Sequence, residues 1–175
     1  MKALRGRGQK VLYLDYDGVL HHENVLRHPR RGIYLAAPPE FTLFQHAALL
    51  EQLLAPHPDI NIVLSTSWVR VLRFSHALKR LTPGLRQRVI GATYHTQMHE
   101  AAFAMLPRGV QVLDDAERRG PADWLALDDD GVGWPKEHRH RLVLTDARLG
   151  LGAPNMAAEL ARKLAMMTGR EKETP

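Results

Sequence analysis

The chain has 175 residues, a formal net charge of +5, 45% hydrophobic and 25% charged residues, and no cysteine. This balance predicts one soluble globular domain over residues 1–175, large enough to fold without staples, and it excludes disulfides and thiolate metal ligands. No apolar run approaches the roughly 18 residues of a membrane span, so a cytoplasmic protein is expected. The basic balance favours anionic partners, which include phosphorylated small molecules and nucleic acids.

The first predicted strand is the apolar run over residues 11–14, and it leads into Asp15, Asp17 and Gly18. In an extended segment, residues i and i+2 point to the same side. Two acids on one side of a buried strand end are costly unless they are paired, hydrogen-bonded or bound to a cation. The alternative interpretation is a strand that ends in an acidic turn, since Asp-Gly is a common turn pair.

Residues 21–39 predict a loop or flap with a brief extended piece over 32–36, because they combine histidines, a basic cluster and Pro38-Pro39. Apolar positions at helical spacing predict a helix over 41–54, which Pro56 and Pro58 would end. A second strand over 61–64 leads into Ser65, Thr66 and Ser67. Ser67 is expected to cap a helix over 69–81.

Further along, a short strand is predicted within residues 86–93, a weak helix over 94–106 and a helix over 110–119. His95 and His99 stand at i, i+4 and are interpreted as surface histidines, since no third metal ligand has a recognisable spacing. A strand over 124–127 leads into three consecutive acids, and another over 141–144 leads into Thr145 and Asp146. A closing helix over 154–167 and a frayed tail over 169–175 complete the chain.

Strands and helices therefore alternate, and the strands are nearly continuous apolar runs. This pattern predicts an α/β fold: a three-layer, Rossmann-like parallel sheet with helices on both faces. The carboxyl ends of parallel strands share one edge of the sheet, where ligands bind. The strand ends at Asp15, Ser65, Asp128 and Asp146 should therefore meet in one site.

These residues resemble the motifs of the haloacid dehalogenase-like (HAD) phosphohydrolase superfamily, in order along the chain: Asp15-Tyr16-Asp17-Gly18, Ser65, Arg108, and Asp128-Asp129-Asp130. The fuller strings are similar to the HAD domain of Swiss Army Knife RNA repair proteins, over a core of about residues 10–152. The intervals over 19–59 and 68–107 are shorter than the usual domain minimum of about 50 residues, so a HAD-like fold without a large cap domain is expected.

The resemblance implies a role for each acid at the first strand end. Asp15 would be the nucleophile that forms an aspartyl-phosphate. Asp17 would be the general acid toward the leaving oxygen and then the general base toward water. Mg²⁺ would be held by Asp15, by the main-chain carbonyl of Asp17 and by Asp128 or Asp129.

The same resemblance implies the groups that bind the phosphoryl oxygens: the Ser65 hydroxyl, the backbone around Thr66 and Gly18, and the Arg108 guanidinium. Lys79 and Arg80 are rivals for the place of Arg108, although both are expected on an exposed helix face.

The expected function is that of a Mg²⁺-dependent phosphatase, a phosphoric monoester hydrolase related to RNA repair. Its substrates would be RNA or DNA ends or other large phosphorylated molecules, which the basic residues Arg27, Arg30 and Arg31 of the flap would suit. One alternative is a catalytically silent HAD-like module that binds phosphorylated or nucleic acid partners, and the intact acids count against it. Another is a receiver-like phosphoacceptor domain, whose acid pair and acceptor would stand in a different order.

Overall fold

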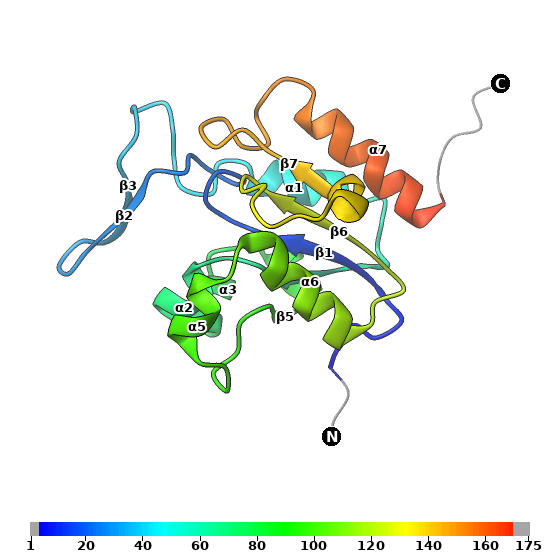
Figure 1. Ribbon diagram of the computed structural model, residues 1–175. Helices are drawn as coiled ribbons and strands as arrows, with labels where there is room; N and C mark the ends of the chain where they lie inside the picture. Colours follow the sequence, from blue (N-terminus) through cyan, green and yellow to red (C-terminus); the bar gives the residue numbers. More distant parts are fainter. Residues whose placement is uncertain (1–3, 170–175) are drawn as a thin grey trace.

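The computed structural model describes residues 4–169, and a five-stranded sheet runs through its middle (Figure 1). Every pairing in this sheet is parallel, and the strands follow the order β5-β4-β1-β6-β7. The chain adds β4 and β5 on one side of β1 and then returns to add β6 and β7 on the other, so the order reverses between β1 and β6. The strands are β1 (Lys10–Leu14), β4 (Ile60–Leu64), β5 (Val89–Ala92), β6 (Asp123–Asp128) and β7 (Leu142–Leu144).

Helices cover both faces of the sheet because β1 is buried on both sides. Leu12 and Leu14 lie in a core that includes side chains of α1 and α7, while Val11 and Tyr13 lie in a second core with side chains of α6. In Figure 1, α1 and α7 lie on one side of the sheet and α6 on the other. The three-layer, Rossmann-like α/β prediction is confirmed. These helices are α1 (Ala47–Leu54), α6 (Arg108–Arg119) and α7 (Met156–Thr168).

The helix predicted over residues 41–54 is wrong in its first half. Residues 41–42 have no regular structure, residues 43–46 form turns, and α1 begins only at Ala47. Phe44 has a φ of 59°, in the left-handed region that no α-helix can include. Its ring packs edge-on against Tyr16 and Trp68, so the apolar spacing here reflects packing of a turn rather than a helical face.

The single helix predicted over 69–81 is also wrong. Arg73 has a φ of 69° and divides the segment into α2 (Trp68–Leu72) and α3 (Phe74–Leu78). Both short helices still contribute to one core, through Val69 and Ala77. The kink thus lets the chain keep its apolar residues inward while it changes direction.

The other elements lie close to their predicted places, with shifted bounds. Residues 86–88 belong to a helix capped by Thr82, so the strand begins at Val89. The weak helix over 94–106 is reduced to its last part, and the helix over 110–119 begins at Arg108. α7 begins at Met156, and the predicted tail lies outside the described residues beyond Gly169. The remaining helices are α4 (Pro83–Arg88), α5 (Glu100–Met105) and the 3₁₀ helix η1 (Lys136–Arg141).

The predicted flap contains an antiparallel hairpin of β2 (Val25–His28) and β3 (Gly32–Leu35). The extended piece predicted over residues 32–36 corresponds to β3, whereas β2 was not predicted. In Figure 1 the hairpin extends away from the sheet and the helices around it. No large cap domain is present among residues 4–169, in agreement with the prediction. Within the same residues, no helix has the length and apolar character to cross a membrane.

Candidate active site

The predicted strand ends come together because the register of the sheet aligns them. Leu14 pairs with Leu64 of β4 and with Leu127 of β6. The next residues therefore lie in one row: the Asp15 N–H donates to the Leu127 carbonyl at 3.1 Å, and the Ser65 N–H donates to the Leu14 carbonyl at 2.8 Å. Polar side chains from β1, β4 and β6 thus meet at the carboxyl edge, beside the point where the strand order reverses.

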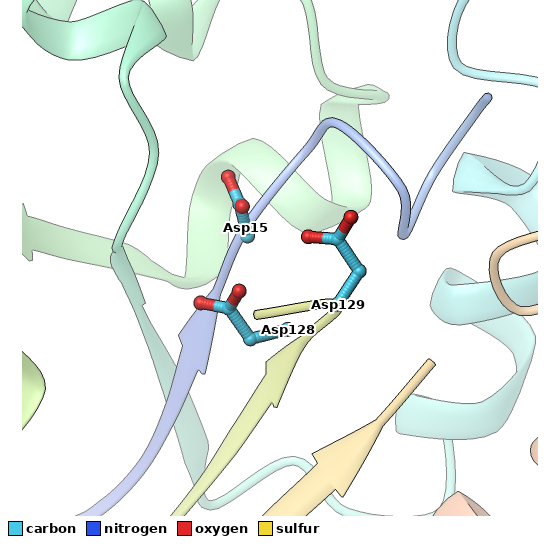
Figure 2. A group of neighbouring side chains, drawn as sticks. All are labelled: Asp15, Asp128 and Asp129. Carbon is cyan, nitrogen blue, oxygen red and sulfur yellow. The ribbon is translucent and has the colours of Figure 1, made fainter. Parts of the chain in front are cut away.

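Three carboxylates gather at this edge. Asp15, Asp128 and Asp129 each offer an oxygen, and these oxygens lie within 4.8 Å of one another. Figure 2 shows the three side chains turned toward a common space beyond the ends of β1 and β6. Asp15 is 3% exposed and Asp128 is 1% exposed. Hard divalent cations prefer carboxylate oxygens, so these residues fit the predicted Mg²⁺.

Burial, together with the charges of neighbouring acids, raises the pKa values of all three carboxyl groups. Burial is the main reason that the pKa of Asp15 is raised, and the Arg108 guanidinium opposes the effect. Burial and the neighbouring Asp15 charge likewise hold the pKa of Asp128 well above its ordinary value. For Asp129, burial and Asp15 raise the pKa to about 7. The charged forms of these acids therefore lack compensation from the protein alone, as expected where a cation completes a site.

Arg108, the first residue of α6, is the cation that the chain itself supplies. Its Nη2 lies 3.2 Å from Asp15 and its Nε lies 3.3 Å from Asp128. Nη1 donates to the Ser65 main-chain carbonyl at 2.9 Å. Burial lowers the pKa of Arg108, but the surrounding carboxylates outweigh burial and leave it raised. The guanidinium thus stays charged and ties β1, β4 and β6 together at the site.

The rival cations lie elsewhere. Lys79 and Arg80 are exposed, and the Arg80 guanidinium lies over the Trp68 ring at 5.7 Å from its centroid.

Two glycines allow close approaches at the site: Gly18 lies against Asp129, and Gly109 of α6 lies against the loop that follows β6. Gly18 has a φ of 69°, and a Cβ built there would lie 2.1 Å from the Asp129 Oδ2. A Cβ at Gly109 would lie 2.4 Å from the Gly133 carbonyl oxygen. Any side chain at Gly18 would therefore displace Asp129, and any at Gly109 would push α6 from the loop that follows β6.

Ser65 and Thr66 lie beside Asp15. The Ser65 Oγ is buried and has no hydrogen-bond partner among the described residues. A buried hydroxyl without a partner is rare in folded proteins unless a ligand supplies one. The Thr66 hydroxyl hydrogen-bonds the Asp15 carboxylate and acts to lower the pKa of Asp15. Phosphate binding by these two residues stays a prediction of the resemblance.

Asp17 lies apart from the three-acid group. Its Oδ1 accepts hydrogen bonds from Trp68 Nε1 at 2.8 Å and pairs with His21 Nε2 at 2.9 Å. The sequence interpretation missed both His21 and Trp68. The signals available were a histidine four residues after Asp17 and a tryptophan directly after the Ser-Thr-Ser run.

Other polar residues from the sequence interpretation have local structural roles. Asp130 accepts from the Val132 N–H at 2.8 Å, and Asp146 accepts from the Leu149 N–H at 2.8 Å, so both cap turns. Ser67 stands at the start of α2 but makes no side-chain capping bond, which makes the capping prediction wrong. His99 caps α5 through Ala102, a role that its position in the sequence did not indicate.

A cavity of about 180 Å³ lies next to Arg108. Thr66 and Arg70 belong to its lining, and so does Phe103 of α5. Gln111 holds this wall, because its Nε2 donates to the Phe103 and Leu106 carbonyls at 3.2 and 2.9 Å while its Oε1 faces Arg108 Nη1 at 3.4 Å. Arg70 makes no ion pair or side-chain hydrogen bond with any described residue. The sequence interpretation missed Arg70, since nothing local distinguishes it from other basic residues.

The parallel sheet, the short connections and the strand-end acids define a HAD-like α/β domain. The family model for the HAD domain in Swiss Army Knife RNA repair proteins matches residues 11–156, and the chain belongs to this family. No curated protein and no solved structure matches the chain. The resemblance found in the sequence is confirmed, and membership points to a function of the phosphohydrolase type.

Proposed function

We propose that this protein is a Mg²⁺-dependent phosphatase that works through an aspartyl-phosphate on Asp15. The observation that carries the proposal is that the buried Asp15 and Asp128 lie together with the half-buried Asp129, while Arg108 pairs with the first two. Three acids exceed what Arg108 can neutralise, and the raised pKa values of these acids reflect that excess. Apolar residues in place of a purely structural cluster would make the fold more stable. A surplus of buried negative charge is instead expected where the acids bind a cation and act on a phosphoryl group.

In the first step, an Asp15 oxygen attacks phosphorus as the bond from phosphorus to the leaving oxygen breaks. Asp17 donates a proton to that oxygen. In the second step, water attacks the phosphorus of the aspartyl-phosphate and Asp17 takes its proton. Inorganic phosphate leaves and the Asp15 carboxylate is restored, so one covalent intermediate divides the hydrolysis into two easier steps.

Mg²⁺ would be held by Asp15, by the Asp17 main-chain carbonyl and by Asp129. Asp128 is a weaker candidate for direct binding, because its Oδ2 faces Arg108 and its Oδ1 accepts the Asp130 N–H at 3.0 Å. The cation supplies positive charge that offsets the repulsion between a carboxylate nucleophile and an anionic phosphate.

The phosphoryl oxygens would be bound by groups that lie around Asp15. Arg108 keeps its charge and presents a planar fork that suits two oxygens of a phosphate. The unpartnered Ser65 hydroxyl would donate to a third oxygen. The main-chain N–H groups of Gly18 and Thr66 would complete the cradle. Such donors stabilise the transferring group because they are already in place before reaction.

The proposed substrate is a phosphorylated RNA or DNA end. Three features support it: the family includes RNA repair proteins, no large cap is present among the described residues, and the hairpin of β2 and β3 carries exposed arginines. Arg70 also lines the cavity beside Arg108, and it forms no ion pair with a carboxylate among residues 4–169. A cytoplasmic location and a single catalytic domain belong to the same proposal.

The test is to trap the covalent intermediate. Purified protein is mixed with Mg²⁺ and a radiolabelled phosphorylated oligonucleotide, quenched in acid, and counted for label on the protein. We expect label on the wild type, less label on Asp17→Asn because the alkoxide leaving group then lacks its general acid in the first step, and none on Asp15→Asn. The exposed Asp114→Asn is the matched control and should behave as wild type.

Label on Asp15→Asn, or its absence from both the wild type and Asp17→Asn across oligonucleotide, nucleotide and sugar phosphates, would refute the proposed chemistry. Tight Mg²⁺-independent binding of phosphorylated ends without turnover would then favour the silent binding module.

A further inference from the structure

One oxygen of the Asp17 carboxylate is held by two N–H groups. Trp68 Nε1 lies 2.8 Å from Asp17 Oδ1, and His21 Nε2 lies 2.9 Å from the same atom. Among the described residues, Asp17 Oδ2 accepts no hydrogen bond. The two carboxylate oxygens therefore have different surroundings, and Oδ2 is the one left for a reacting group.

The proton on His21 is fixed by a main-chain donor. The Phe44 N–H donates to His21 Nδ1 at 3.1 Å, so Nδ1 is an acceptor and the neutral ring carries its proton on Nε2. That proton points to Asp17 Oδ1. The left-handed conformation of Phe44, with φ of 59°, is the backbone feature that accompanies this contact. The turn at 43–46 thus selects the tautomer of His21.

Aromatic packing holds the imidazole in place. His21 is 0% exposed, and its ring lies 4.8 Å from the Phe44 ring and 5.8 Å from the Trp68 ring, between centroids. Phe44 and Trp68 also contact each other edge-on at 5.2 Å. The ring therefore cannot turn away from Asp17 without opening this cluster.

We propose that His21, together with Trp68, is a positioning residue for the proton transfers of Asp17. The two N–H groups hold Oδ1 and set the direction in which Oδ2 delivers a proton to the leaving oxygen and then takes one from water. This inference rests on the proposed function, because it assigns a role to neighbours of the proposed general acid. Geometry of this kind matters because small displacements of a catalytic group cost rate steeply.

The test uses the dependence of rate on the leaving group. A good leaving group such as nitrophenolate needs little protonation, whereas an alkoxide needs much, so a misplaced general acid harms the second far more. His21→Leu introduces an apolar side chain of similar size and removes the donor. His21→Gln keeps an N–H donor, and Trp68→Phe keeps an aromatic ring without its N–H. The exposed His76→Leu serves as the matched control.

We expect His21→Leu to lower kcat/KM for an alkyl phosphate by about 100-fold, with a much smaller loss on nitrophenyl phosphate. Trp68→Phe should steepen the leaving-group dependence in the same direction, and His21→Gln should restore part of the loss. Circular dichroism checks that each variant is folded. If the His21 variants do not fold, Trp68→Phe still tests the proposal.

Equal losses on both substrates would assign His21 and Trp68 to packing alone and overturn the inference while the phosphatase stands. A wild type that hydrolyses neither substrate nor any phosphorylated end would overturn the proposed function and this inference together.

Discussion

An arginine forms ion pairs with carboxylates at each end of α6, and the charge balance of the two clusters differs. At the C-terminal end, Asp115 is 1% exposed and receives bonds from Arg119 Nε at 2.7 Å and Arg119 Nη2 at 3.0 Å. Tyr13 OH donates to it at 2.9 Å and Arg118 Nη2 at 3.3 Å. One acid there has two guanidinium partners, and both of its oxygens are occupied.

At the N-terminal end of α6 the ratio is reversed. Among residues 4–169, Arg108 is the single guanidinium within ion-pair distance of Asp15 and Asp128, and Asp129 lies in the same group. The cluster at Asp115 ties α6 to β1 and is complete within the protein. The cluster at Arg108 has surplus negative charge and an unpartnered hydroxyl at Ser65. A complete cluster is suited to stability, and an incomplete one to binding a cation and a phosphoryl group.

Asp15→Asn gives the largest expected effect and separates activity from stability. Turnover of any phosphorylated substrate should fall by at least about 10,000-fold, because the amide cannot act as nucleophile. Since the pKa of Asp15 is raised, its charged form weakens the fold at neutral pH, so the metal-free variant should unfold at a higher urea concentration than wild type. A loss of stability together with activity would show that the cluster is structural.

Asp115→Asn should give the opposite result. It leaves Arg119 buried without a carboxylate, and breaking a buried pair in this way costs about 3–5 kcal/mol. We expect the free energy of unfolding to fall by this amount in urea titrations, while kcat of the remaining folded protein changes little. The exposed Asp114→Asn again provides the control on the same helix. A stable variant with low kcat would instead place Asp115 in the chemistry.

Removal of Mg²⁺ should expose the charge surplus as a pH dependence. Asp129 has a pKa of about 7 in the metal-free fold and an ordinary value of 3.8, so between these values the folded state binds more protons than the unfolded state. Stability in chelator should therefore fall as pH rises from the ordinary value of 3.8 to about 7.

The matching measurements use a second variant and added metal. Asp129→Asn should flatten the decline in chelator, and Mg²⁺ should reverse it in wild type, with affinity that increases through the same pH range because protons compete for the carboxylates. Urea titrations at each pH measure the first effect and calorimetry measures the second. If Asp129→Asn loses stability with rising pH as steeply as the wild type, other groups cause the pH dependence.

The parts of the site that could be predicted from sequence are those fixed by strand register. Asp15, Ser65 and Asp128 each follow an apolar run, and parallel pairing alone brings such residues to one edge. The place of Arg108 followed from the order of motifs in the resembled family. The interior of α6 was also visible, because its apolar residues recur at helical spacing.

The missed parts depend on contacts between segments far apart in sequence. Trp68 and Asp17 are separated by 51 positions, and nothing near either residue indicates that they touch. The left-handed turn at Phe44 is stabilised by rings from other segments, so its apolar spacing imitated a helix. Strand β2 carries the basic and exposed residues of a loop, and only its pairing with β3 shows it to be extended.

Arg70 extends the comparison to an arginine that pairs with no carboxylate of the described residues 4–169. Its guanidinium lines the cavity beside Arg108 without an ion pair in the described part of the chain, so it is free to bind an anion. Arg70→Gln should raise KM for a phosphorylated oligonucleotide by about 10-fold, the size of one charge-assisted hydrogen bond, with KM for an aryl phosphate unchanged. The exposed Arg139→Gln is the control. Equal changes on both substrates would mean that Arg70 acts on the reacting phosphate itself, whereas a selective change would identify it as the contact for the next phosphate of the strand.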